Sequence, residues 1–298
     1  MAEGPVLNRV VVGYDGSRHA ERALEYAVDE ALSRGAELEL LCGSVPEWGR
    51  RLRGMVEDAA ERAGDRAPGL TVHTTVTAEP AAVALVEQGA KAALTVVANR
   101  GHGGFAGLLL GSVGRRVAAH ARMPLLVVRG ESEEPRRKSP RLERSEAELR
   151  ARGRVLLAVR SGADDDAVAY AFAEAERHGA EICALHAWQY PPSVKGATAG
   201  AGARSAARTA ADAAVREAGR MVPRRAVAPY RRTYPDLPVT VRDECRDAAP
   251  VLVEATRQAD VVVLAVHRGA RPYGLQLGPV AHALLHHSFC PVVLVPVL

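Results

Sequence analysis

Two segments of the chain combine glycines with polar side chains that are able to bind a ligand. The first follows a run of valines and reads Gly13-Tyr14-Asp15-Gly16-Ser17. A carboxylate placed after a strand can accept hydrogen bonds from a ribose or hold a metal ion. Asp15 or Ser17 can equally cap the helix that follows, because both residue types are common at helix N-termini. The sequence leaves these two interpretations open.

The second segment joins an apolar run to a helical pattern. It begins at Ala98 and has five glycines from Gly101 to Gly111. Glycines let the backbone approach a phosphate, and a helix start offers unpaired N–H groups and the positive end of the helix dipole. Ser112 adds a hydroxyl donor, and Arg100 is long enough to reach a phosphate. The segment is neither a Walker loop, since no Gly-Lys-Ser/Thr follows, nor a dinucleotide loop, which should follow the first strand.

Alternating strand and helix patterns surround both segments. Apolar runs predict strands in the first half of the chain at residues 9–14, 38–42, 70–76, 93–98 and 124–128. Helical spacing predicts helices at 20–31, 52–63, after Pro80 and at 111–121, with Gly35 ending the first of them. This alternation predicts an α/β fold with an open, doubly wound parallel sheet. Ligands bind beyond the carboxyl ends of the strands in such sheets, and both segments lie there.

An internal repeat divides the chain. The stretch GSVGRRVAAHARMPLLVV from Gly111 aligns with GPVAHALLHHSFCPVVLV from Gly278 at an offset of 167. Near the start of each copy the offset is 145, which pairs Asp15 with Arg160, so the second copy has a net insertion of 22 residues. Its strands are expected at 155–159, 181–186, 239–242, 261–266 and 291–295. The repeat predicts two tandem domains.

The domain boundaries follow from this repeat. We expect a first domain at 1–130, a charged linker at 131–153 and a second domain at 154–298 with a basic insert at 190–238. Residues 191–238 contain nine Lys/Arg and three Asp/Glu. A local excess of this kind either attracts phosphates and nucleic acid or forms the solvated face of a helix.

Three features together resemble the universal stress protein family across both copies. The strand VVVGYDGS ends in Asp15, and the closing helix and strand end in ARMPLLVV. The family loop, Gly-x2-Gly-x9-Gly-Ser/Thr, is present as Ala98-x2-Gly101-x9-Gly111-Ser112. The resemblance implies tandem five-stranded, Rossmann-like domains of the adenine-nucleotide alpha hydrolase type. It also implies that ATP or another adenine nucleotide is bound.

The resemblance assigns roles to residues of the first copy. Asp15 would contact the ribose, where it could also hold Mg²⁺, and the backbone near Gly13 and Gly43 would frame the adenine. The phosphates would be held by Gly101, Gly111, Ser112 and Val113, with Arg100 as a helper. Ala98 departs from the family pattern, because its methyl group replaces the first glycine of the loop.

The second copy departs further from the family pattern. Arg160 stands at the position of Asp15, Arg268 replaces the second glycine and Pro279 replaces the loop hydroxyl. Proline has no N–H to offer a phosphate. We therefore expect ATP in the N-terminal domain only, although a different anion would suit Arg160, His267 and Arg268.

The sequence supports several functions, of which a nucleotide-binding stress or signalling protein with little turnover ranks first. A slow ATPase is an alternative, although the sequence shows no clear general base. A partner-binding protein with a decayed nucleotide site is another, and the basic insert alone suggests nucleic acid. The family implies that the two domains pair through their last strands, 125–128 and 292–295, and that a homodimer is plausible.

Other signals in the sequence are weak. No apolar run is long enough for a membrane span and no signal peptide is visible, so a cytoplasmic protein is expected. The four cysteines contain no CxxC pair, and we expect them to be reduced. His282 and His286 share a helical face, which fits either a metal pair without a third ligand or ordinary surface and packing residues.

Overall fold

The computed structural model describes residues 7–43, 49–99, 101, 111–129, 153–189, 204–267 and 277–297, with the backbone alone at 204–211. The predicted linker, Arg100 and Arg268 lie outside these residues. Within the described part of the chain, no helix is both long enough and apolar enough to cross a membrane.

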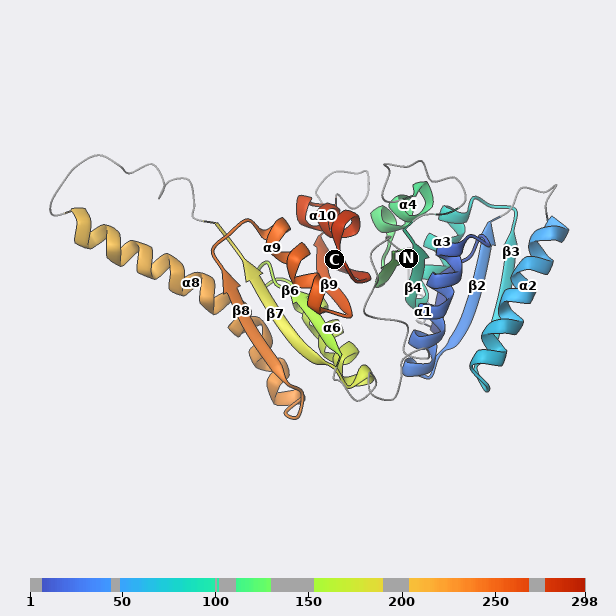
Figure 1. Cartoon of the computed structure of the whole chain (residues 1–298), viewed down its shortest axis with the longest axis horizontal. Helices are drawn as coiled ribbons and strands as arrows, with labels where there is room; N and C mark the ends of the chain where they lie inside the picture. Colours follow the sequence, from blue (N-terminus) through green and yellow to red (C-terminus); the bar gives the residue numbers. More distant parts are fainter. Residues whose placement is uncertain are drawn as a thin grey trace, which may run out of the picture.

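The strands form one continuous ten-stranded sheet that runs through the whole molecule (Figure 1). Its order is β3-β2-β1-β4-β5-β10-β9-β6-β7-β8. The strands are β1 (Leu7–Gly13), β2 (Glu37–Gly43), β3 (Val72–Thr77), β4 (Ala92–Ala98), β5 (Leu125–Val128), β6 (Arg154–Ala158), β7 (Glu181–Ala187), β8 (Val239–Glu244), β9 (Val261–His267) and β10 (Val292–Val297). Each half has the same internal order, with its first and fourth strands side by side at the centre. The α/β fold with two doubly wound halves is therefore confirmed.

The two halves meet where β5 pairs with β10. This pair is antiparallel, with Val127 opposite Val292 and Leu125 opposite Leu294, whereas every other neighbouring pair among the described strands is parallel. All four of these side chains are buried. Strands covered on both faces read as continuous apolar runs, which explains the Val and Leu repeats at the end of each copy.

Helices cover both faces of the sheet. They are α1 (Arg18–Arg34), α2 (Gly49–Arg66), α3 (Ala81–Gly89), α4 (Ser112–His120), α6 (Asp165–His178), α8 (Arg204–Thr233), α9 (Ala248–Ala255) and α10 (Pro279–His287), with a short 3₁₀ turn η3 (Thr256–Gln258). One buried cluster joins the sheet to α1, α2, α6 and α8, and a second joins its other face to α3, α4, α9 and α10. Along β1, Val10 and Val12 enter the first cluster while Val11 enters the second, as the period of two along a strand requires.

The ends of α1 follow from local sequence. The Ser17 hydroxyl accepts a hydrogen bond of 3.2 Å from the N–H of Ala20 and so caps the first turn. Gly35 has φ 57° and ends the helix in the left-handed conformation, as predicted. Between the caps, small residues such as Ala23 and Ala27 let the helix lie close to the sheet.

The basic insert contains the long helix α8, which takes the place of α2 in the second half. It has 30 residues and includes Pro223 and Pro229. Its C-terminal half packs on the sheet through Val227 and through Tyr230, whose ring stacks 5.2 Å from that of Phe172. The N-terminal half extends beyond the sheet (Figure 1). Among the side chains of this helix that the structure describes, six arginines are exposed: Arg216, Arg220, Arg224, Arg225, Arg231 and Arg232.

Candidate functional site

The end of β1 forms a tight turn that holds Asp15. Gly16 adopts φ 77°, which a residue with a side chain rarely tolerates. Asp15 Oδ1 accepts a hydrogen bond of 3.0 Å from the N–H of Ser17. Ser17, and not Asp15, is the N-cap of α1, and Asp15 has a second carboxylate oxygen, Oδ2.

That second oxygen faces the loop after β4. A β-carbon built on Gly101 would lie 2.3 Å from Asp15 Oδ2, far inside van der Waals contact. The two segments singled out in the sequence therefore meet at one point, between β1 and β4. This is where strand order reverses in the N-terminal half, and such switch points are where open α/β sheets bind ligands.

The start of α4 lies beside the end of β4. The N–H of Gly111 donates to the carbonyl of Asn99 over 2.7 Å, and Asn99 in turn bonds Val128 of β5 over 2.8 Å. Gly111 is the N-cap, so Ser112 and Val113 open the helix with N–H groups that have no partner in the preceding turn. Ser112 is exposed and Val113 is half-buried. Arg100 lies outside the described residues, and its phosphate role stays a prediction.

Two predicted adenine-framing glycines have a packing reason of their own. A β-carbon on Gly43 would lie 2.5 Å from the backbone nitrogen of Ala81 in α3. On Gly13 it would lie 2.9 Å from Leu85 of the same helix. Both glycines let α3 approach the sheet, and their role toward adenine stays a prediction. Ala98 ends β4, and its methyl group packs against the buried cluster on the α1 face.

Two further side chains at this edge were not predicted from the sequence. Burial, reinforced by the charge of Asp15, raises the pKa of the Cys42 thiol at the end of β2. The Tyr14 hydroxyl donates to Glu21 Oε1, and Arg62 lies 3.3 Å from that hydroxyl and 2.9 Å from the same carboxylate oxygen. Burial and the bond to Glu21 raise the pKa of Tyr14, so this phenol stays protonated at neutral pH.

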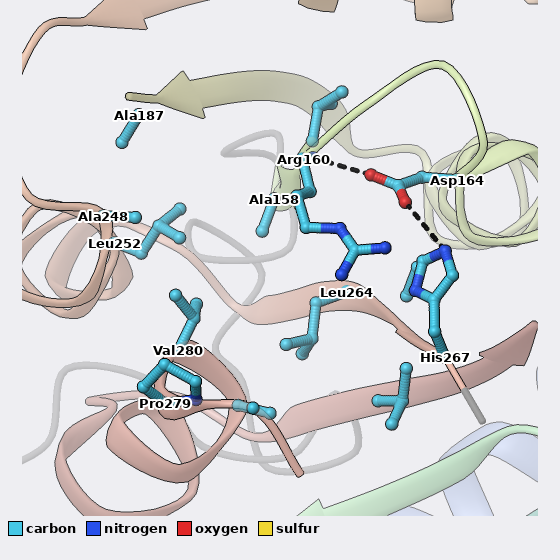
Figure 2. Close-up of a pocket in the computed structure, with 15 residues that line it drawn as sticks. Ala158, Arg160, Asp164, Ala187, Ala248, Leu252, Leu264, His267, Pro279 and Val280 are labelled. Atoms are coloured by element: carbon cyan, nitrogen blue, oxygen red, sulfur yellow. Dashed lines mark hydrogen bonds and ion pairs between the residues drawn. The ribbon is translucent and has the colours of Figure 1, made fainter. Parts of the chain in front are cut away.

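The second half has a cavity of about 280 Å³ at the corresponding place (Figure 2). It lies beyond the carboxyl ends of β6 and β9, between α9 and the start of α10. Its apolar lining includes Ala158, Ala187, Ala248, Leu252, Leu264 and Val280. Pro279 is the first residue of α10 and takes the place of Ser112. The start of this helix therefore lacks one N–H, as predicted from the sequence.

Three polar side chains lie together at one end of this cavity (Figure 2). Asp164 is 1% exposed, and its Oδ2 accepts hydrogen bonds from the N–H groups of Arg160 (2.6 Å) and Ser161 (2.9 Å). Its Oδ1 lies 3.6 Å from Nε2 of His267. Arg160 and His267 were predicted from the sequence. Asp164 was not singled out as a site residue from the sequence, because its contact with His267 spans 103 residues.

The described residues offer little for metal-dependent chemistry. Within them, the one group of three close metal-ligating side chains is Glu30, Glu174 and His178, and it lies between α1 and α6. Arg34 donates to both carboxylates and Arg177 pairs with Glu174 over 2.6 Å, and these two positive charges disfavour a metal cation there. The His282 and His286 rings stack at 3.9 Å, and no third ligand joins them in the described part of the chain.

Comparison with known proteins supports the repeat. A model of the universal stress protein family matches residues 7–129 and again residues 151–296. A universal stress protein from Mycolicibacterium smegmatis is 28% identical over 310 residues, which cover 96% of each chain. One from Mycobacterium tuberculosis is 27% identical over 316 residues, covering 98% of each.

Solved structures share the fold over the whole chain. The crystal structure of a universal stress protein from Archaeoglobus fulgidus matches with a TM-score of 0.60 at 16% identity, covering 97% of this chain and 98% of that one. A putative universal stress protein from Pseudomonas aeruginosa matches with a TM-score of 0.58 at 16% identity, covering 97% and 93%. The tandem arrangement is thus shared with other proteins of about this length.

Proposed function

This chain belongs to the universal stress protein family, and we propose that its N-terminal half binds ATP or another adenine nucleotide in stress response or signalling. Nucleotide binding, rather than fast catalysis, is the activity that its residues favour. The observation that carries the proposal is the contact between Asp15 and Gly101 at the switch point between β1 and β4.

The proposed site has two parts, Asp15 after β1 and the loop that leads from β4 into α4, and each part binds a different portion of the nucleotide. Asp15 accepts hydrogen bonds from the ribose hydroxyls, since a carboxylate is an acceptor for two such donors. The backbone at Gly101, Gly111, Ser112 and Val113 offers N–H groups and the positive end of the α4 dipole to the phosphates. Arg100 adds a cation, and Mg²⁺ would reduce phosphate repulsion near Asp15. The small volume of Gly101 keeps these two parts close enough to serve one ligand.

Slow hydrolysis is a weaker alternative. Phosphoryl transfer needs a positioned base or a group that orients water. Glu30 belongs to the group of metal-ligating side chains named above, but it lies about three helical turns along α1 from the end that is next to Asp15. It is therefore too far from the proposed nucleotide site to act as this base. A nucleotide-independent protein that binds a partner is the other alternative, and the site experiment below separates all three.

Calorimetry with ATP and Mg²⁺ tests the proposal on the full chain, after denatured protein has been checked for carried-over nucleotide. We expect one site per chain. Gly101→Ala places a methyl group against Asp15 and should weaken binding by about tenfold or more. Gly54→Ala is the matched control, because a β-carbon there meets nothing within 4 Å.

Each other result has a defined meaning. Two sites per chain would contradict the restriction to the N-terminal half. No binding, with no carried-over nucleotide, would favour the partner-binding alternative. Phosphate release in the same sample would favour the ATPase. Equal affinity in Gly101→Ala and Gly54→Ala would place the nucleotide elsewhere.

A further inference from the structure

The cavity of the C-terminal half has the opposite charge from the corresponding site of the N-terminal half. Arg160 lies after β6 where Asp15 lies after β1, at equivalent positions of the repeat. A cation therefore replaces a carboxylate at the switch point between β6 and β9. A ligand that pairs with Asp15 through donors would meet donors here, so the two halves select different chemistry.

The Arg160 guanidinium is positioned to meet a ligand. Its side chain extends into the cavity and ends near Asp164, Leu264 and His267 (Figure 2). Only the backbone N–H of Arg160 bonds Asp164. Among the residues that the structure describes, the guanidinium has no ion-pair partner. Its planar set of five donors matches the two oxygens of a carboxylate.

The nearby carboxylate does not cancel this cation. Asp164 is buried and directs Oδ2 at two backbone N–H groups, which stabilise the carboxylate without using the Arg160 guanidinium. Its Oδ1 has no hydrogen-bond partner among the described residues and faces His267. Both ring nitrogens of His267 likewise lack a hydrogen-bond partner within that set. The imidazole N–H of His267 is therefore not used by any described residue and can be offered to a ligand beside Arg160.

The described walls of the cavity suit an apolar ligand better than a polyphosphate. These walls are alanine, leucine and valine side chains, and Pro279 removes one of the N–H groups that a phosphate would use at the start of α10. A volume of about 280 Å³ lies near the lower limit of ligand pockets, about 300 Å³, so the occupant is small.

We propose that this cavity binds a small monocarboxylic acid with an apolar body, whose carboxylate pairs with Arg160 and accepts a hydrogen bond from His267. The hydrocarbon or aryl part of the acid lies against Ala248, Leu252 and Val280. The inference is independent of nucleotide binding in the N-terminal half, and it gives the second half a ligand of its own.

Titration calorimetry of the full chain with sodium hexanoate and sodium benzoate tests this inference. The amides hexanamide and benzamide, of nearly the same shape without the charge, are the matched probes. We expect at least one of the acids to bind saturably at one site per chain and its amide to bind about tenfold more weakly or worse. The acid that binds better shows whether the apolar body is aliphatic or aromatic.

Variants locate the site. Arg160 is exposed, so Arg160→Gln should leave the fold intact and weaken acid binding by about tenfold or more. Arg160→Lys keeps the positive charge but not the two parallel N–H donors of a guanidinium. Its affinity for the acid should lie between those of wild type and Arg160→Gln. Asp15→Asn should leave acid binding unchanged, because it alters only the N-terminal half.

Four outcomes would overturn the proposal. They are the absence of saturable binding by both acids up to about 10 mM, equal binding of acid and amide, unchanged binding in Arg160→Gln, and competition between acid and ATP for one site. A failure of ATP to bind, with acid binding intact, would count against the proposed function alone.

Discussion

Arg34 and Glu174, 140 residues apart in the sequence, form a buried ion pair of 3.1 Å that joins α1 to α6. Their side chains are only 10% and 4% exposed. Arg34 also bonds Glu30 in its own helix over 2.8 Å and donates to the Tyr170 hydroxyl over 2.8 Å. One guanidinium therefore links the two halves on the face of the sheet that carries α1, in addition to the β5–β10 pair.

Removal of this guanidinium should destabilise the protein strongly. Arg34→Met removes one of the cations that the buried Glu30 and Glu174 carboxylates share, while His178 stays beside both and Arg177 beside Glu174. We expect a loss of about 3 kcal/mol in the free energy of unfolding. Arg62→Met is the control, since the Arg62–Glu21 pair is about half exposed and should cost about 0–1 kcal/mol. Urea unfolding measures both losses. Equal losses would show that the buried ion pairs of Arg34 contribute no more to stability than the exposed pair of Arg62.

His178 gives the same cluster a dependence on pH. Burial alone would lower its pKa, but the carboxylates of Glu174 at 3.2 Å and Glu30 at 3.4 Å outweigh burial and raise it to about 10. The folded state therefore binds a proton more tightly than the unfolded state, whose histidine has a pKa of about 6.5. The stabilisation is fully present below about pH 6.5 and is lost as pH rises toward 10.

The matching experiment compares unfolding free energies of wild type and His178→Gln between pH 6.5 and 10. Wild type should lose more stability than the variant over this range, by a difference on the order of a few kcal/mol. Parallel curves would mean that His178 does not carry the extra proton in the folded state.

The cysteines should differ in reactivity. Cys245 is exposed, whereas Cys42, Cys183 and Cys290 are buried. Burial also raises the pKa of Cys42 and of Cys183, which reduces the thiolate fraction. Iodoacetamide labelling followed by mass spectrometry should modify Cys245 on the order of a hundredfold faster than the other three, which react only on local opening. Cys245→Ser should abolish the fast phase, and fast labelling of Cys42 would contradict its burial.

Most strands could be predicted because a central strand of a parallel sheet must be apolar at every position. The runs at Val10–Val12 and Val292–Leu294 are buried on both faces, so their pattern reflects their place in the sheet. Caps such as Gly35 follow from backbone conformation, which is a local property. In the structure Gly101 follows β4 by three residues and Gly111 is the N-cap of α4, and their role toward phosphates stays a prediction.

Contacts between distant segments could not be predicted. Nothing near Asp164 in the sequence indicates that its side chain faces His267, and nothing near Arg34 points to Glu174. Helix α8 continues through Pro223 and Pro229, although proline normally ends or kinks a helix. Its packing through Val227 on the sheet supplies a stabilisation that local propensity does not contain.

A substitution at Gly43 tests whether this glycine is needed for the packing of α3 or for the binding of adenine. A β-carbon there would lie 2.5 Å and 2.6 Å from the backbone nitrogen and Cα of Ala81, and the backbone of α3 has no flexible side-chain end that could move aside. Gly43→Ala should therefore cost about 1–3 kcal/mol in urea unfolding. Gly64→Ala is the control: it lies inside α2, meets nothing within 4 Å and should be neutral or stabilising by up to about 1 kcal/mol. If Gly43→Ala unfolds like wild type but loses ATP binding, the glycine serves the adenine and not α3.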